Sequence, residues 1–181
     1  QHEIEALMNL RPESKKLELT RDLFIFSCFT GLAYSDVRSL KAHEIVRTID
    51  GVDWIKTHRT KTKTKANIPL LPIPKNIISK YVRLQDLHPD ELIFKVYSNQ
   101  KINDYLKVLA KLAKIEKKVS FHIARHTFAT TVTLQNGIPI ETVSKMLGHT
   151  NIKTTQHYAK VLDSKISKDM EILKSHYLRI A

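Results

Sequence analysis

Residues 121–158 bring together side chains that can cleave a phosphodiester. His122 and Arg125 lie three residues apart, so on a helix they project from one face. His149 follows a glycine at an expected helix end, and Tyr158 comes nine residues later. A phenol can attack as a nucleophile, a guanidinium can balance the charge of an oxyanion, and imidazoles can place protons. These residue types therefore predict attack on a phosphodiester, with tyrosine as the nucleophile.

This stretch resembles the tyrosine recombinase (integrase) family through two sequence motifs. The first motif is His122-x-x-Arg125-His126, which is similar to the family's second catalytic box. The second motif is Leu147-Gly148-His149 followed by Thr154-Thr155-Gln156-His157-Tyr158, which is similar to the third box, including the spacing to the nucleophile. Two boxes in the right order and at the right spacing are a more specific signal than either alone.

The family's first box is also recognisable, with one departure. Residues 30–40 resemble it, and there the residue after Gly-Leu is normally the first catalytic arginine. Here that residue is Ala33, which is followed by Tyr34, Ser35 and Asp36. The pattern is similar to that of integrases of conjugative transposons and other mobile elements that lack this arginine. The resemblance therefore raises the question of which residue replaces it.

Arg59 is the preferred substitute for the arginine missing at Ala33. Residues two apart on a strand face the same side, so Arg59 is expected to point with Lys61. Arg38, one helical turn beyond Ala33, is the alternative. A third interpretation makes Arg59 one more member of a basic strip that faces DNA.

The resemblance implies a role for each candidate. Tyr158 would attack a DNA phosphate to form a 3′-phosphotyrosyl bond, while Arg125 and His149, with Arg59, hold the developing charge. His122 would assist proton movement. A 5′-hydroxyl from a second duplex would then reverse the chemistry, and no metal, nucleotide or redox cofactor would be required.

The resemblance also implies a lysine that protonates the departing 5′ oxygen. In the family this lysine lies on a hairpin, eight residues before a proline that ends the third strand. Counting back from Pro69 gives Lys61, with Lys63 and Lys65 as close competitors. A lysine suits the role because its ammonium can be desolvated against phosphate and then release a proton.

Each of these candidates has a simpler interpretation. Tyr158 alone would be taken as an ordinary core aromatic. Arg125 would be taken as a surface ion pair, but no Asp or Glu occurs between Lys117 and Ile140, which favours an external anion. His122 and His126 have the spacing of a metal pair on a helix, but no third ligand lies at a suggestive spacing. His126 is better explained as a structural histidine bonded to the backbone.

The charge of the chain favours a polyanionic partner. Lys and Arg number 30 against 18 Asp and Glu, a formal net charge of +12. Between Trp54 and Gln85 there are eight Lys or Arg and no acidic residue. Such a run is usually a solvated face, but beside a phosphate-cleaving site it predicts a surface against a DNA backbone. The candidate DNA-binding residues are Lys56, Lys61, Lys63 and Lys65.

The pattern of apolar residues predicts a mainly α fold with a small three-stranded antiparallel sheet. β-Forming residues and the Asp50-Gly51 turn indicate strands at about 44–49, 52–59 and 65–70. Apolar spacing predicts helices over 2–9, 17–29 and 103–114, and others that start near Ser35 or Asp36, after Pro74, at Phe121, at Pro139 and at about Asp163. The helix from Phe121 is expected to run to Asn136-Gly137, with His122, Arg125 and Ala129 on a face that opens on a cleft.

These observations predict a single C-terminal catalytic domain over residues 1–181, without the family's N-terminal DNA-clamping domain. The chain begins at Gln1 without an initiator Met, which indicates a fragment. Cys28 is expected to be a buried thiol. No apolar run suits a membrane span and no signal peptide is visible, so we expect a soluble protein of the bacterial cytoplasm.

The expected partner is double-stranded DNA. We expect a monomer in isolation and a homotetramer on two DNA sites, assembled through an exposed apolar stripe on the C-terminal helix that includes Ile166, Met170 and Leu173. A recombinase-like module that binds DNA without cutting it is the alternative function, because the first arginine is missing. A type IB topoisomerase, which shares the phosphotyrosine chemistry, is a further alternative.

Overall fold

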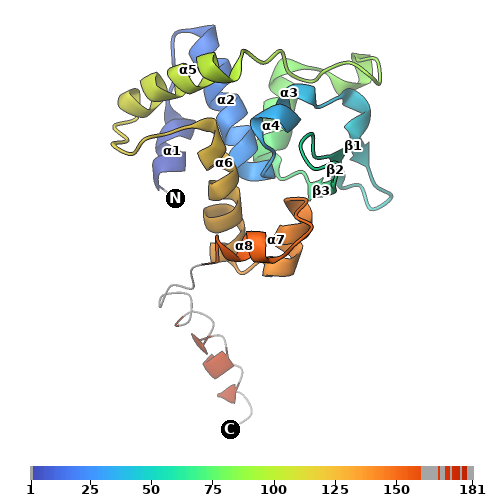
Figure 1. Cartoon of the computed structure of the whole chain (residues 1–181), viewed down its shortest axis with the longest axis vertical. Helices are drawn as coiled ribbons and strands as arrows, with labels where there is room; N and C mark the ends of the chain where they lie inside the picture. Colours follow the sequence, from blue (N-terminus) through green and yellow to red (C-terminus); the bar gives the residue numbers. More distant parts are fainter. Residues whose placement is uncertain (1, 160–166, 168–169, 172, 176, 179–181) are drawn as a thin grey trace.

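The domain is built around one central helix. The computed structural model describes residues 2–159, 167, 170, 171, 173–175, 177 and 178. Helix α2 (Lys15–Thr30) runs through the middle of the molecule, and several helices pack along it (Figure 1). They include α1 (His2–Asn9), α4 (Pro72–Tyr81), α5 (Asn99–Leu112) and α6 (Phe121–Thr127). The predicted fold class, mainly helical with a small sheet, is confirmed.

Helix α2 is central because its second half is mainly apolar and is buried on nearly every side. Leu23, Phe26 and Cys28 are fully buried, so this part of the helix needs neighbours all round. Cys28 is the buried thiol that the sequence predicts, and burial raises the pKa of its thiol. The helix ends at Gly31, whose φ is +71°. A Cβ on Gly31 would lie 2.5 Å from the Phe128 ring, so glycine permits this close approach.

The small sheet lies beside the helices and has the predicted strands. Strands β1 (Ile45–Arg47), β2 (Asp53–His58) and β3 (Lys65–Pro69) pair antiparallel in that order. Ile55 on β2 lies opposite Ile68 on β3, and both side chains are buried against the helices. Lys56, the next residue along β2, is exposed because side chains alternate between the faces of a strand.

The helix that begins at Phe121 is not continuous, contrary to the prediction. After α6 the chain forms a π-helical segment, η3 (Phe128–Thr133), and a short 3-10 helix, η4 (Leu134–Asn136), which ends at Gly137. The Thr133 hydroxyl donates to the carbonyls of Phe128 and Ala129 at 2.9 and 2.8 Å. A threonine hydroxyl that bonds to preceding carbonyls favours departure from regular α-helix. The sequence pattern did not reveal this.

The remaining elements of the described residues are short. They are α3 (Tyr34–Ser39), η1 (Ala42–Glu44), η2 (Leu84–Asp86), α7 (Ile140–Met146) and α8 (Lys153–Gln156). Helices α7 and α8 lie at the end of the molecule that α6 and η3 approach (Figure 1). Within the described residues, none of the helices has the length and apolar content that a membrane span needs.

The predicted C-terminal helix falls largely outside the described residues. Asp163, where it is expected to begin, and Ile166 are not described. Met170 and Leu173, from the predicted apolar stripe, are described and are 55% and 46% exposed.

Candidate active site

Arg125 is the buried centre of the candidate site. Its side chain projects from α6, and the residue is only 4% exposed. Nη1 donates to the carbonyl oxygen of Gly31 at 2.6 Å, and Nη2 donates to that of Leu147 at 2.6 Å. Burial and the nearby charge of Arg59 lower the pKa of Arg125 to about 10, so the guanidinium is still charged at neutral pH. Three separate parts of the chain therefore meet at one cation.

The prediction that this face of α6 opens on a cleft is only partly right. Ala129 and Arg125 are both buried, because η3 packs against α2. His122 is the member of the face that is exposed. It lines a cavity of about 340 Å³ together with Ala33 and Arg125. The position that lacks the family's first arginine therefore borders an open space next to Arg125.

Arg59 lies beside Arg125. Its Nη1 donates to the Leu147 carbonyl oxygen at 3.1 Å, the same oxygen that accepts from Arg125. Its Nε donates to Oδ2 of Asp36, also at 3.1 Å, in an ion pair whose side chains are 12% and 1% exposed. Arg38, the alternative substitute, is exposed on α3 and makes no hydrogen bond within the described part of the chain. The structure thus brings Arg59 into the site and leaves Arg38 outside it.

The expectation that Arg59 and Lys61 point to the same side of one strand is wrong. Strand β2 ends at His58, so Arg59 and Lys61 do not share a strand face. The chain turns instead, with a hydrogen bond from Arg59 N to the Thr64 carbonyl and another from Lys63 N to the Arg59 carbonyl, each 2.8 Å. Arg59 turns inward to Asp36, whereas Lys61 remains exposed at the turn.

Asp36 is a residue whose contribution the sequence analysis missed. Its buried carboxylate accepts hydrogen bonds from Arg59, from Thr60 N at 2.8 Å and from Ala33 N at 3.3 Å. The Ala33 bond also caps the start of helix α3. The signal in the sequence for such a role was an acidic residue in the first turn of α3. Asp36 holds the chain segment that carries both Arg59 and Lys61 in place through its hydrogen bonds.

His149 is held as a neutral imidazole. Its Nε2 lies 3.0 Å from Arg125 Nη2, and its Nδ1 lies 2.8 Å from the Thr155 hydroxyl. Burial, followed by the charges of Arg125 and Arg59, lowers the pKa of His149 to about 4. The imidazole is therefore uncharged near neutral pH, when no anion occupies the site.

Gly148 lets the hairpin approach the loop that carries His149. Its φ is +63°, and a Cβ there would lie 2.9 Å from Cγ of Arg59 and 3.2 Å from the Lys65 carbonyl oxygen. The Thr64 hydroxyl donates to the Gly148 carbonyl at 2.6 Å. The hairpin between β2 and β3 thus packs directly against the loop that carries His149.

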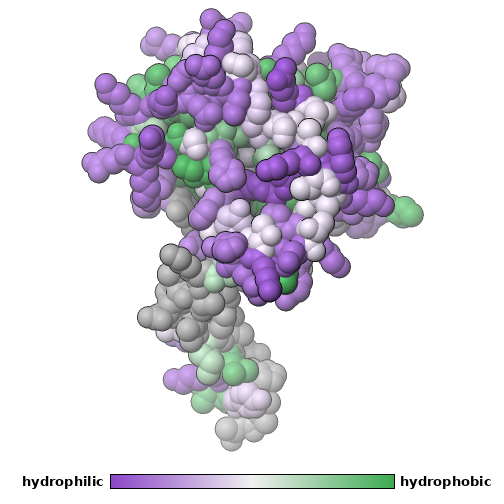
Figure 2. Space-filling view, viewed as in Figure 1, coloured by the Kyte–Doolittle hydropathy of each residue, from purple (hydrophilic) through white to green (hydrophobic). Residues whose placement is uncertain are grey.

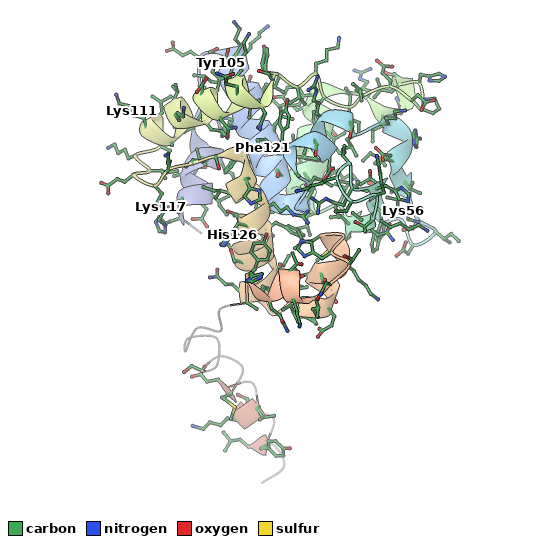
Figure 3. The ribbon with its side chains drawn as sticks, viewed as in Figure 1. Lys56, Tyr105, Lys111, Lys117, Phe121 and His126 are labelled. Atoms are coloured by element: carbon green, nitrogen blue, oxygen red, sulfur yellow. The ribbon has the colours of Figure 1, made fainter. Side chains whose placement is uncertain are left out.

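Tyr158 completes the cluster. Its ring stacks on that of His149, with centroids 6.4 Å apart and an interplanar angle of 9°. The ring of His126 meets it edge-on, at 5.1 Å and 79°. The sequence predicts that His126 bonds to the backbone, but the structure gives it this ring contact and leaves it exposed, at the end of α6 toward α8 (Figure 3). His126 therefore contacts the predicted nucleophile.

The four candidate DNA-binding lysines are all exposed on the sheet and its hairpin: Lys56, Lys61, Lys63 and Lys65. Hydrophilic side chains cover most of the face shown in Figure 2. Lys56 lies on the sheet side of the molecule and Lys111 and Lys117 lie at the opposite edge (Figure 3). Within the described residues, no group of three or more His, Cys, Asp or Glu is arranged to hold a metal ion.

Together these residues form a mainly helical domain in which an arginine cluster, a histidine and a tyrosine meet beside a lysine-bearing hairpin. Residues 1–165 match the phage integrase family. The chain belongs to this family.

Individual relatives and structures agree with this assignment. Tyrosine recombinase XerC of Rickettsia bellii is 30% identical over 146 residues, which are 76% of this chain and 46% of that protein. The XerH site-specific recombinase bound to its palindromic difH substrate has a similar fold, with a TM-score of 0.71 at 18% identity over 95% of this chain and 50% of that one. The Tn1549 transposon integrase in complex with circular intermediate DNA has a TM-score of 0.66 at 17% identity, over 93% and 64% of the two chains. The chain spans about half the length of the curated relatives it matches.

Proposed function

We propose that this protein is a site-specific DNA recombinase that cuts and rejoins strands through a 3′-phosphotyrosyl intermediate. The observation that carries the proposal is a chain of contacts from the two arginines to the tyrosine. Arg125 and Arg59 share the Leu147 carbonyl oxygen, Arg125 contacts His149, and the Tyr158 ring stacks on that of His149. Two guanidiniums and an imidazole next to a phenol suit the charge that develops when an oxygen attacks a phosphate. The DNA complexes of XerH and of the Tn1549 integrase support DNA as the substrate, and the latter supports a mobile element as the source.

In the first step the Tyr158 oxygen bonds to phosphorus and the bond from phosphorus to the 5′ oxygen breaks. The phenol loses its proton to solvent, with His122 assisting this proton movement, and Lys61 supplies a proton to the departing oxygen. Arg125 and Arg59 offer N–H donors to the non-bridging oxygens, and His149 donates to one of them. In the second step a 5′-hydroxyl of a partner strand attacks the phosphotyrosine, which restores Tyr158.

Lys61 is the preferred general acid among the hairpin lysines. Its side chain is exposed at the turn, two residues from Arg59, so it is free to close on a bound strand. Lys63 is held in the turn with a positive φ of 55°, and Lys65 begins strand β3. Lys56, Lys63 and Lys65 would bind the backbone phosphates of DNA that lies against the sheet.

The proposed assembly is a tetramer on two DNA sites, with residues 1–181 as the catalytic domain and the C-terminal helix of each protomer packed on its neighbour. The exposed side chains of Met170 and Leu173 support this arrangement, because exposed apolar side chains favour burial in an interface. Isolated protomers are expected to be monomeric.

The first experiment uses nicked suicide DNA that carries the ends of the element encoding the protein. Cleavage of such DNA releases a short fragment that cannot religate, so a covalent protein–DNA species accumulates and is visible on denaturing gels. We expect an adduct with the natural protein and none with Tyr158→Phe. A protein that binds the site and forms no adduct would overturn the enzyme proposal and leave the DNA-binding module, which the alanine at position 33 favours. Relaxation of supercoiled DNA that lacks the site would identify a topoisomerase instead.

A further inference from the structure

Thr155 touches both His149 and Tyr158. Its hydroxyl oxygen lies 2.8 Å from Nδ1 of His149, and its carbonyl accepts a hydrogen bond from Tyr158 N at 2.9 Å. The side chain is fully buried in α8. Thr155 therefore links the imidazole of His149 to the turn of the chain that carries Tyr158.

The partners of His149 determine which of its nitrogens carries the proton. A guanidinium nitrogen has hydrogens to donate and no lone pair to offer, so His149 Nε2, 3.0 Å from Arg125 Nη2, must be the acceptor. A neutral imidazole has one N–H, which then lies on Nδ1. Nδ1 donates it to the Thr155 hydroxyl. In the free site His149 thus presents a lone pair, and no proton, on Nε2.

A phosphate oxygen requires the other tautomer of His149, because that oxygen can only accept a hydrogen bond. To donate to a phosphate oxygen, Nε2 must carry a proton, and Arg125 must turn its N–H from Nε2 to the phosphate. A neutral imidazole achieves this by losing the Nδ1 proton to solvent and gaining one on Nε2, with no net change in charge. Nδ1 then needs a donor in place of an acceptor. A hydroxyl can act as either, so Thr155 can pair with Nδ1 in both tautomers.

We propose that Thr155 is a positioning residue that keeps His149 oriented in both of its tautomers. This inference deepens the proposed function and rests on it for the step in which His149 meets phosphate. In the free protein, the pairing of Thr155 with Nδ1 follows from the hydrogen-bond geometry. The groups near His149 include Arg125 from α6, Arg59 from the hairpin and Tyr158 after α8, with Asp36 of α3 behind Arg59. Lys65 of β3 and Lys145 of α7 line a cavity together with His149.

The chain offers a matched set of variants for a test. Thr155→Val keeps the shape of the side chain and removes the hydroxyl, whereas Thr155→Ser keeps the hydroxyl. Thr154, the neighbouring threonine, is exposed, so Thr154→Val is the control for the loss of a hydroxyl in the same helix. A buried threonine needed only for packing would tolerate valine.

The first measurement is NMR of the free protein with 15N-labelled histidine. Long-range proton–nitrogen correlations distinguish the protonated ring nitrogen from the bare one, and His149→Gln assigns the signals. We expect the proton on Nδ1, with a hydrogen-bonded, slowly exchanging signal in the natural protein, Thr155→Ser and Thr154→Val. In Thr155→Val that signal should broaden or exchange rapidly. A proton on Nε2 in the natural protein, or an unchanged signal in Thr155→Val, would overturn the inference.

The second measurement is the rate of covalent adduct formation on suicide DNA. We expect Thr155→Val to be slower by about ten-fold, the scale of one lost hydrogen bond, and the other two variants to stay near the natural rate. Equal rates for Thr155→Val and the natural protein would count against a role in the reaction. If no protein forms an adduct while NMR finds Nδ1 protonated and bonded to Thr155, the proposed function fails and the assignment of Thr155 in the free protein survives.

Discussion

At the scale of single residues, two guanidiniums lie beside Ala33, which stands where the resemblance expects an arginine. Ala33 leaves a cavity beside Arg125, and Arg59 reaches the same carbonyl oxygen as Arg125 from the hairpin. Asp36 neutralises part of the added charge and holds the guanidinium in place. Burial and the two cations together lower the pKa of His149, which keeps the imidazole uncharged near neutral pH.

The first prediction concerns which arginine takes the role of the one that is missing at position 33. Arg59→Ala should slow adduct formation by about 100-fold or more, the usual effect of removing one donor to a developing oxyanion. Arg38→Ala should react like the natural protein. Because the cavity at Ala33 is open toward Arg125, Ala33→Arg should restore part of the rate in the Arg59→Ala background. The reverse ranking of Arg59→Ala and Arg38→Ala on suicide DNA would show that Arg38 is the substitute.

The second prediction concerns acid stability. The pKa of His149 is about 4 in the folded chain against an ordinary 6.5, so between these values the unfolded chain binds a proton that the folded chain does not. The contribution of His149 to stability is therefore present above about pH 6.5 and is lost as the pH falls toward 4. We expect the free energy of unfolding, from urea titrations at several pH values, to fall more steeply over this range than in His149→Gln. Parallel curves for the two proteins would contradict the prediction.

At the scale of elements, the hairpin between β2 and β3 and the loop after α7 behave as one unit. Thr64 and Arg59 bind the carbonyls of Gly148 and Leu147, and Gly148 allows the contact because it has no Cβ. Lys61 sits in the same hairpin turn, so the position of the proposed general acid depends on the loop that carries His149.

The third prediction tests this contact. Gly148→Ala places a Cβ 2.9 Å from Arg59 Cγ at a positive φ, and it should lower the free energy of unfolding by about 1–3 kcal/mol and slow adduct formation. Gly51→Ala is the matched control, because its φ is also positive, +78°, but nothing lies within 4 Å of the added Cβ. Denaturant titration gives the loss of unfolding free energy in each variant. The loss in Gly51→Ala measures backbone strain alone, and the additional loss in Gly148→Ala measures the effect of the close approach. Equal losses in the two variants would show that the approach of the hairpin has no energetic consequence.

At the scale of the whole molecule, the net charge of +12 and the exposed lysines of the sheet predict electrostatic binding to DNA. Neutralised phosphates release counterions, so the affinity should fall steeply as salt rises. Arg59 belongs to this basic hairpin and shares the Leu147 carbonyl oxygen with Arg125, so DNA bound at the hairpin would lie near both guanidiniums. Other lysines of the same acid-free run already have acidic partners, as Lys75 has in Asp53.

The fourth prediction concerns that salt dependence. Replacing Lys56 and Lys63 by alanine should weaken binding to all DNA sequences alike and reduce the slope of log affinity against log salt by about 1 for each phosphate that is no longer neutralised. Lys75→Ala should change the slope less, since the ammonium of Lys75 is paired with Asp53 in the free protein. Fluorescence anisotropy over a range of salt concentrations measures the slope. An unchanged slope in the double variant would place the DNA on another face.

The sequence by itself determined the parts of this protein that depend on local spacing. His122 and Arg125 share a helical region, His149 follows Gly148, and Tyr158 follows at the family's distance, because each relation spans a few turns of one segment. The strands and the buried Cys28 also followed from local apolar pattern.

The tertiary structure decided the direction and surroundings of those side chains. Arg59 turns inward because an acid 23 residues earlier, Asp36, holds it, and it meets the Leu147 carbonyl 88 residues later. Burial of Arg125 and the neutral state of His149 arise only when α2, α6, the hairpin and the loop after α7 come together. No periodicity along the chain encodes these contacts, since charge and desolvation act through space between segments that are far apart in sequence.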